Sequence, residues 1–308
     1  MSSLLRKMSC LLSIFYFNNM SKIISRDEAI TNIIKKKLKK SYKKNLKKTH
    51  VEFNKQLYSL LSKKKLYNFL RKSFIQKMFF VHNRFFIFKE LIKLKKDPNW
   101  KFYEKLLVED NVGNPIRYFL YPKSSGNKIN HIYHLSILND YFKLNFKKIS
   151  YVFEFGGGYG CMARIFSKIN SKIKYCIYDT ELVNLLQFYY LRHNNLNVGF
   201  RNKDQIILKN KFLKYNSNYK KKTLFIANWS LSETPLNFRN KIINIINNYE
   251  YIMICYQETF EDINNKNYFN NIKHKIKKKY NVKIILNSFY KGNVFKTQRH
   301  YFFLAKRL

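Results

Sequence analysis

From residue 149 onward, short apolar segments with the pattern of strands alternate with longer segments that have helical periodicity. This alternation predicts an α/β fold in which helices cover both faces of a mainly parallel sheet of seven strands. The short Tyr290–Asn293 connection allows the last two strands to be antiparallel neighbours. The predicted strands are Tyr151–Phe155, Ile173–Tyr178, Leu196–Phe200, Thr223–Asn228, Tyr251–Tyr256, Val282–Phe289 and Tyr301–Ala305. The predicted helices between them are Cys161–Ile169, Glu181–His193, Asn237–Asn248 and Asn264–Lys279.

The segment before residue 149 has a different sequence pattern. Residues 21–96 combine many lysines with apolar residues at steps of three and four, which predicts helices that end before Pro98. A further helical pattern runs from about Ile129 to Phe146. A length of 308 residues suits one large domain or two small ones. We therefore expect a basic helical N-terminal region over residues 1–110 and an α/β domain over residues 111–308.

The net charge of +42 is open to two interpretations. One is an anionic partner, either nucleic acid or a membrane surface. The other is a biased genome, because Lys, Asn, Ile, Tyr and Phe are abundant together. The charge is uneven: residues 1–100 hold 25 basic and 5 acidic residues, and residues 151–200 hold 5 basic and 3 acidic residues. The first strands of the predicted sheet are therefore nearly neutral.

The cysteines and the apolar runs indicate the compartment. Cys10, Cys161, Cys176 and Cys255 are scattered, which is typical neither of a zinc site nor of a disulfide framework. The apolar run near the start, Leu11–Phe17, is far shorter than the roughly 20 residues that cross a bilayer. We therefore expect a cytoplasmic protein without a membrane span.

The most specific motif is Glu154-Phe155-Gly156-Gly157-Gly158-Tyr159-Gly160, which connects a predicted strand to a predicted helix. Four of the eight glycines of the chain lie in it. Glycine allows a sharp turn and a close approach of the backbone to a ligand, and the following helix presents free N–H groups. The dinucleotide pattern G-x-G-x-x-G fails, because Cys161 stands where its last glycine would be. An acid two residues before the loop favours a cationic or amine-bearing ligand.

This segment resembles the class I S-adenosylmethionine (SAM) methyltransferase superfamily, in which E-x-G-x-G-x-G follows the first strand. The resemblance implies a Rossmann-like, seven-stranded sheet that binds SAM. The Val152–Gly160 motif, Asp179 and the Leu185–Leu191 segment look most similar to a sugar O-methyltransferase family. That resemblance covers roughly residues 110–308. It implies cofactor binding by Glu154, Gly156, Gly157, Gly158, Gly160 and Asp179.

The ends of the predicted strands supply further candidates. Asp179 closes the second strand, where an acid can bind a ribose diol, although it can equally cap the next helix. Asp204 follows the third predicted strand and is either an adenine contact or an exposed loop acid. The fourth strand ends in Asn228 and Trp229. We expect Asn228 to hold the methionine part or the substrate, and the ring of Trp229 to suit the face of a sugar.

Three residues are candidates for the chemistry of methyl transfer, which needs an aligned hydroxyl and an acceptor for its proton. Glu233 is a possible base, or else a first-turn acid that interacts with a helix dipole. His131 and His134 share a helix face, and imidazoles have a pKa near neutrality, although such histidines are more often structural. No spacing of carboxylates and histidines indicates a metal site, so we assign no metal ligands. The resemblance to sugar methyltransferases, some of which depend on a metal, leaves metal dependence open.

The sequence as a whole predicts a SAM-dependent O-methyltransferase that modifies a sugar hydroxyl in polysaccharide or glycolipid biosynthesis. The expected partners are a sugar or glycan acceptor and, through the basic surface, an anionic membrane. The alternative is a nucleic-acid-binding protein or RNA methyltransferase that uses the basic helices. No D/N-P-P-[FYW] motif for base amines is present, which counts against that alternative. The sequence leaves the oligomeric state open.

Overall fold

A computed structural model describes residues 27–38, 51–63, 66–79, 85–211, 221–289 and 299–308. The chain forms two compact units, Met1–Leu66 and Tyr67–Leu308. In the first unit, residues 27–38 and α2 (Val51–Ser62) are helical, which agrees with the predicted helical N-terminal region. The expected domain boundary near residue 110 stays a prediction.

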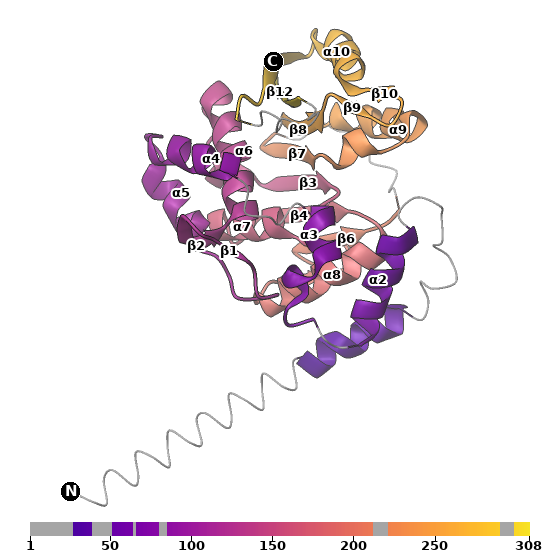
Figure 1. Cartoon of the computed structure of the whole chain (residues 1–308). Coiled ribbons are helices and arrows are strands. Elements are labelled where there is room, and N and C mark those ends of the chain that lie inside the picture. Colours follow the sequence, from indigo (N-terminus) through magenta and orange to yellow (C-terminus); the bar gives the residue numbers. More distant parts are fainter. Residues whose placement is uncertain (1–26, 39–50, 64–65, 80–84, 212–220, 290–298) are drawn as a thin grey trace, which may run out of the picture. The chain divides into compact units, whose positions relative to one another are not determined.

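The second unit begins with elements that precede the main sheet (Figure 1). α4 and α5 pack against α6, the long helix that carries both candidate histidines. α6 begins directly after Ser125, whose side chain accepts a hydrogen bond from the Lys128 backbone N–H and caps the helix. The elements are η1 (Phe69–Arg71), α3 (Ser73–Phe79), α4 (Phe85–Lys95), α5 (Trp100–Leu107), β1 (Arg117–Tyr118), β2 (Tyr121–Ser125), α6 (Gly126–Phe142) and η2 (Phe146–Lys148).

The main sheet has eight strands in the order β11-β12-β8-β7-β3-β4-β6-β5. Neighbouring strands from β5 to β8 run parallel, and β12 is antiparallel to both β8 and β11. The strands are β3 (Tyr151–Phe155), β4 (Lys174–Tyr178), β5 (Val198–Gly199), β6 (Ile206–Lys209), β7 (Thr223–Asn228), β8 (Tyr251–Gln257), β11 (Tyr280–Leu286) and β12 (His300–Arg307). A separate pair, β9 (Thr259–Phe260) and β10 (Ile263–Asn264), follows β8.

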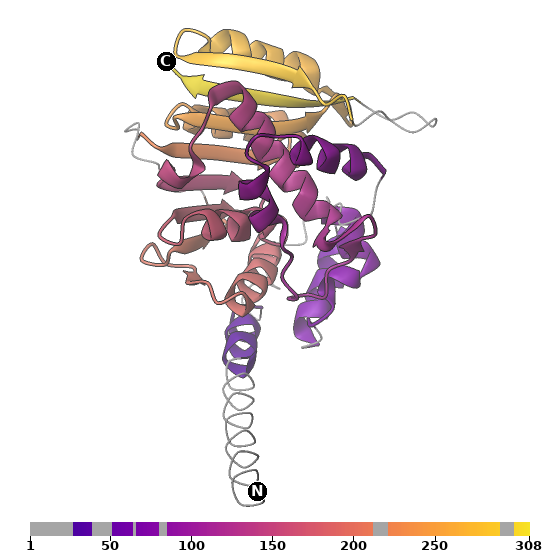
Figure 2. The same cartoon turned by 90° about the vertical axis from the view of Figure 1, so that its left-hand side faces the viewer.

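Side chains alternate between two covered faces of this sheet. On one face, residues such as Phe153, Phe225 and Phe303 form a hydrophobic core with α9 (Leu236–Ile246) and α10 (Asn265–Ile276). On the other face lie α6, α7 (Cys161–Ile169) and α8 (Glu181–His193), as Figures 1 and 2 show. The predicted α/β, Rossmann-like fold with helices on both faces is confirmed, as is the antiparallel final pair.

One detail of the sheet differs from the prediction. The predicted strand Leu196–Phe200 is reduced to the two residues of β5, and an eighth strand, β6, follows it. The Asp204 carboxylate packs against Gly199 at the end of β5, where a Cβ would lie 2.2 Å from it. The Asp204 Oδ2 atom accepts a hydrogen bond from the Arg201 backbone N–H and so closes the turn between the two strands.

The strand order defines where a ligand can bind. From β3 the chain continues outward to β4 and then to β5 at the edge, and β6 lies between these two strands. The chain then returns to β7 on the other side of β3 and continues to β8. The topological switch point therefore lies between β3 and β7. In open α/β sheets, ligands bind outside the carboxyl ends of the strands at such a point.

Candidate functional site

The glycine loop connects β3 to α7 at the switch point. Gly156, Gly158 and Gly160 have φ values of +71°, +54° and +101°, in the left-handed region that side chains disfavour. The Gly156 N–H donates to the Tyr178 carbonyl across the end of β4, and the Gly160 N–H donates to the Gly157 carbonyl. Gly160 then caps α7. The loop is therefore a fixed turn at the carboxyl edge of the sheet, as the motif predicted.

The glycines of this loop meet different surroundings. A Cβ on Gly156 would lie 2.2 Å from the Ser230 Cβ, because the chain segments that follow β3 and β7 approach each other there. A Cβ on Gly157 would lie 2.6 Å from Ile177 and 3.0 Å from the Glu154 carboxylate. At Gly158 the nearest atom would be a ring carbon of Phe79, at 3.5 Å. The first two glycines are thus required by packing, whereas Gly158 has room beside it.

This contrast gives a test of the loop. Gly156→Ala and Gly158→Ala both place a side chain at positive φ, which costs about 1–2 kcal/mol. Only the alanine at 156 also overlaps Ser230, and overpacking adds roughly 1–3 kcal/mol. Urea unfolding is therefore expected to show a larger loss of stability for Gly156→Ala, by about 2 kcal/mol. Equal losses would contradict the close approach of the two chain segments.

Glu154 lies beneath the loop on the α7 face of the sheet. Its side chain is buried, and the Tyr175 hydroxyl donates to its Oε2 at 2.8 Å. Burial raises the pKa of Glu154 to about 8; the Tyr175 hydrogen bond opposes this increase and the nearby Asp179 adds to it. The predicted cofactor acid is therefore adjacent to the loop and to Asp179, and it has a pKa that a cationic neighbour would lower.

Asp179 follows β4 and is joined to the glycine loop by a residue that the sequence analysis did not single out. Gln187, on α8, donates from its Nε2 to the Asp179 Oδ2 at 3.0 Å and to the Gly158 carbonyl at 2.9 Å. The Asp179 Oδ1 accepts from the Thr180 N–H at 2.7 Å. Burial raises the pKa of Asp179 to about 7, against these hydrogen bonds. The motif around Gln187 was the available signal, but sequence alone showed no role for its amide.

The carboxyl end of β7 faces the glycine loop across the switch point. Asn228 ends the strand, and its side-chain amide interacts with the His134 imidazole without reaching standard hydrogen-bond geometry. Trp229 follows with φ +66° and ψ −40°, a backbone conformation that is rare for a bulky residue. Its ring contacts the ring of His300 edge to face, at 4.3 Å between centroids.

Histidines surround Trp229. His134 is fully buried, its Nδ1 lies 3.5 Å from the Cys255 Sγ, and its ring centroid lies 6.3 Å from that of Trp229. The His131 ring lies 6.4 Å from the ring of His134. Burial lowers the pKa of these histidines to about 4 for His131, about 3 for His134 and about 3 for His300. All three imidazoles are therefore neutral at pH 7.

His300 is a site residue that sequence reasoning missed. It begins β12, and it pairs with Gln257 at the end of β8 because β12 returns antiparallel to the same edge. The signal was present in the predicted antiparallel pair, since the start of such a strand lies beside the carboxyl end of its neighbour. The prediction began this strand one residue later, at Tyr301, and so left the histidine outside.

Glu233 belongs to a second polar group at this edge. Its Oε1 accepts from the Gln257 Nε2 at 3.3 Å, and the Ser232 hydroxyl donates to the Gln257 Oε1 at 2.7 Å. Burial raises the pKa of Glu233, while Gln257 and Arg239 oppose the increase. Arg239 is buried and hydrogen bonds to Asn265 and to the Ser232 carbonyl, both at 2.5 Å. The structure thus brings Glu233 to Gln257 at the carboxyl end of β8.

Asp204 does not contribute to this edge. It lies before β6, where its backbone carbonyl accepts from the Lys174 Nζ at 3.3 Å. Lys174 starts β4, so Asp204 is at the amino-terminal edge of the sheet, opposite the glycine loop. The possible adenine contact is therefore corrected: Asp204 serves the turn between β5 and β6. The sequence analysis placed it wrongly because it did not find β6.

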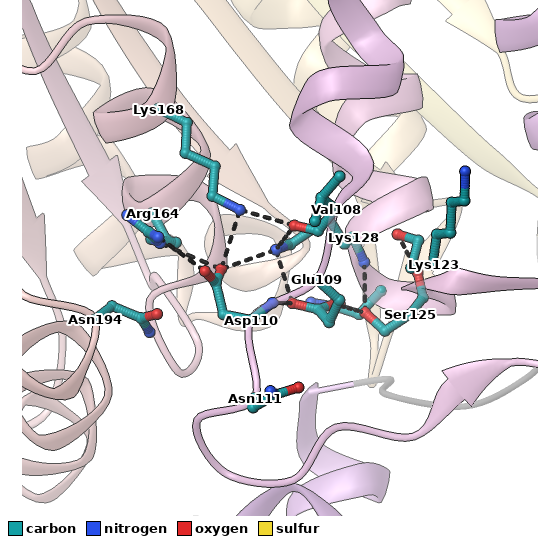
Figure 3. A network of polar contacts seen from close by, with 12 residues as sticks. Val108, Glu109, Asp110, Asn111, Lys123, Ser125, Lys128, Arg164, Lys168 and Asn194 are labelled. Atoms are coloured by element: carbon teal, nitrogen blue, oxygen red, sulfur yellow. Dashed lines mark hydrogen bonds and ion pairs between the residues drawn. The ribbon is translucent and has the colours of Figure 1, made fainter. Parts of the chain in front are cut away.

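A buried ionic network connects residues 108–110 to α6 and α7 (Figure 3). The Lys128 Nζ lies 2.7 Å from the Glu109 Oε1 and 3.1 Å from the Asp110 Oδ2, and its side chain is fully buried. Arg164 and Lys168 of α7 also pair with Asp110, at 2.8 and 3.3 Å. The network therefore ties the start of α6 and the helix that follows the glycine loop to residues 108–110.

The described residues contain neither a metal-binding group nor a membrane-spanning helix. No group of three His, Cys, Asp or Glu side chains in these parts of the chain is arranged to hold a metal ion. Among the same residues, no helix is both long and apolar enough to cross a membrane.

The comparisons with known proteins give distant structural similarities. No known protein family matches the sequence, and no curated protein matches it. A SAM-dependent methyltransferase from Aquifex aeolicus is 14% identical, with a TM-score of 0.38, over 70% of this chain and 97% of its own. Precorrin-6y C5,15-methyltransferase from Geobacter metallireducens is 11% identical, with a TM-score of 0.37, over 56% of this chain and 86% of its own. An rRNA methylase from Streptococcus thermophilus is 11% identical, with a TM-score of 0.37, over 53% of this chain and 92% of its own.

Similarities at this level carry no argument about activity or substrate. The fold is established by the strand order and the pairing of the strands. The resemblance to a sugar O-methyltransferase family stays a prediction.

Proposed function

We propose that this protein is a SAM-dependent O-methyltransferase that transfers a methyl group to a sugar hydroxyl during polysaccharide or glycolipid synthesis. The observation that carries the proposal is the joining of the glycine loop to Asp179 through the Gln187 amide, at the switch point of the sheet. This arrangement fixes a backbone turn and a ribose-binding acid in relation to each other. The sheet edge where they lie is the edge at which α/β folds bind nucleosides.

The residues present fit SAM. Two acids, Glu154 and Asp179, lie at the loop, which suits a ligand that carries a sulfonium and an amine. The Gln187 Oε1 is buried and has no hydrogen-bond partner among the described residues, so it can accept from a ligand donor. Asp179 would hold the ribose diol, and the glycine loop and Asn228 would hold the remainder. When bound, SAM would supply an electrophilic methyl group.

The protein's own contribution to the chemistry would be alignment and proton acceptance. Neutral His131 and His134 can each accept a hydrogen bond from a hydroxyl at pH 7, because burial keeps them unprotonated. Glu233 is the alternative acceptor, and Gln257 holds its carboxylate in place. The partly exposed ring of Trp229 offers an apolar face to a sugar.

The cofactor assignment is tested at Gly158. A Cβ at this position makes only ordinary contacts with the Phe79 ring. We therefore expect Gly158→Leu to fold, at the cost of positive φ and of a shift of that ring, and to crowd the volume beside the loop. Calorimetry is expected to show that SAM binding falls at least tenfold. Gly158→Ala is the matched control, with the same backbone strain and less bulk. Unchanged SAM affinity in the leucine variant, with an intact fold, would show that the loop does not hold the cofactor.

A further inference from the structure

A group of side chains near the end of β7 contains buried polar atoms whose cost in folding free energy is not explained by packing. We call it the histidine cluster, and its members are His131, His134, His300, Asn228 and Trp229. Buried polar atoms in proteins are nearly always hydrogen bonded. Within the described part of the chain, the His131 Nδ1 has no hydrogen-bond partner. The His134 imidazole and the Asn228 amide interact with each other, but their atoms do not reach standard hydrogen-bond geometry. His134 is fully buried, and Asn228 is 9% exposed. Apolar residues of the same size would remove this cost, so a structural role alone does not account for these side chains.

The backbone at Trp229 adds a second, independent observation. A non-glycine residue with φ +66° is strained, and such residues cluster at ligand sites. The turn places the indole between the switch point and His300, with its ring against the imidazole. Trp229 and His131 are partly exposed, whereas His134 and Asn228 lie behind them. A ligand can therefore reach the cluster from its indole and His131 side.

The chemistry of the cluster restricts the ligand. Neutral imidazoles and an amide offer both donors and acceptors, which hydroxyl groups match because they also do both. Lys128, whose charge helps to lower the pKa of His131, is already paired with Glu109 and Asp110. Glu90 is buried and receives two contacts from the Asn130 amide, at 2.9 and 3.1 Å. Neither Lys128 nor Glu90 is thus available to balance a charged ligand, and the indole suits the C–H face of a ring.

We infer that the histidine cluster is the acceptor site, and that it binds an uncharged pyranose ring through its hydroxyl groups with the ring face on Trp229. This inference rests on the proposed function and deepens it. It adds His300 to the acceptor site and places it beside Trp229. It also separates the acceptor site from the acids at the glycine loop, which lie on the other side of the switch point.

The chain offers a direct reporter of binding. Only two tryptophans, Trp100 and Trp229, occur in the sequence, so Trp100→Phe leaves Trp229 as the single indole. The fluorescence of this variant, saturated with S-adenosylhomocysteine, would be titrated with methyl α-glucopyranoside, methyl α-galactopyranoside and methyl α-mannopyranoside. The charged probes would be the methyl glycosides of glucuronic acid and glucosamine. We expect a saturable change with at least one neutral glycoside, and binding of both charged probes at least tenfold weaker.

Further variants in the Trp100→Phe background test whether the fluorescence response comes from binding at the histidine cluster. His134→Leu is expected to weaken the neutral glycoside about tenfold, because it removes a buried hydrogen-bonding group. His134→Gln, which retains an amide, is expected to recover part of this loss. His274→Leu is the matched control, since His274 is exposed on α10. It is expected to leave the response unchanged.

Two readouts distinguish this inference from the proposed function. The rise in melting temperature with SAM reports the cofactor site alone. If that rise is intact but no neutral glycoside gives a saturable change, the acceptor-site inference is overturned. Equal binding of charged and neutral probes, or an unchanged response in His134→Leu, would overturn it as well. A saturable response without any SAM effect would instead overturn the proposed function and leave the sugar site standing.

Discussion

Replacing Lys128 by methionine is expected to lower the free energy of unfolding by about 3–5 kcal/mol, the usual cost of breaking a buried ion pair from one side. Burial alone would lower the pKa of Lys128, but Glu109, with Cys161 and Asp110, more than offsets it, so the amine stays charged. Without that charge, Glu109 is left buried with hydrogen bonds from Ser125 and the Asp110 N–H. Chemical unfolding monitored by circular dichroism measures the loss.

Lys168→Met is the matched control for this variant. The Nζ atoms of Lys168 and Lys128 both contact the Val108 carbonyl and the Asp110 Oδ2. The Lys168 side chain is 20% exposed, however, while that of Lys128 is fully buried. Partly exposed pairs contribute roughly 0–1 kcal/mol, so Lys168→Met is expected to cost no more than that. Similar losses in both variants would show that burial does not set the strength of the network.

Raising the pH from 6.5 to 8 is expected to destabilise the protein by about 3 kcal/mol through two buried acids. Burial raises the pKa of Glu90 and of Glu154 from 4.5 to about 8, so both stay protonated in the folded state while the unfolded chain ionises. Their contribution to stability is complete below pH 4.5 and is lost as the pH rises towards 8. The three neutral histidines act in the opposite direction only below about pH 6.5.

Glutamine variants test this pH dependence. Glu90→Gln and Glu154→Gln remove the ionisation while retaining a carbonyl oxygen for Asn130 or Tyr175. Each is expected to remove about 1.5 kcal/mol of the alkaline loss, so the slope of stability against pH flattens. Asp179, whose pKa burial raises to about 7, accounts for part of the loss that remains. Glu250→Gln is the control, because Glu250 is only half-buried and its Oε2 accepts a hydrogen bond from the Lys222 backbone N–H. An alkaline slope that is identical in the wild type and both buried variants would rule out these two acids as its source.

Much of the second unit could be predicted because its sequence pattern is strong locally. The bounds of β3, β7, α7 and α8 agree with the predicted ranges, since each apolar run is flanked by a clear turn or by the glycine loop. The four-residue β6 was missed because a run of Ile206–Leu208 is too short to give a period. Its existence depends on pairing with β4, which is a long-range contact.

In the candidate site, too, features set by local sequence could be predicted, and those set by long-range packing could not. The acids and glycines of the loop could be found from spacing, because one short segment holds most of them. The Gln187 bridge and the position of His300 depend on how α8 and β12 pack. The motif around Gln187 and the predicted antiparallel pair pointed to these segments, but neither pattern showed which atoms the two side chains contact. Asp204 was misplaced by one strand, which moved it to the opposite edge of the sheet.

The contact between Gly156 and Ser230 has a consequence for how such sequences can diverge. These two positions are far apart in the chain but adjacent in the fold. The space between their backbones is filled by the Ser230 side chain, so a Cβ at position 156 does not fit. The Ser230 hydroxyl also donates to the Phe155 carbonyl, so the serine fixes the β3 end of the loop. A lineage that gained a side chain at 156 would have to lose one at 230. The two positions are therefore expected to covary, and drift at either one is limited by the other.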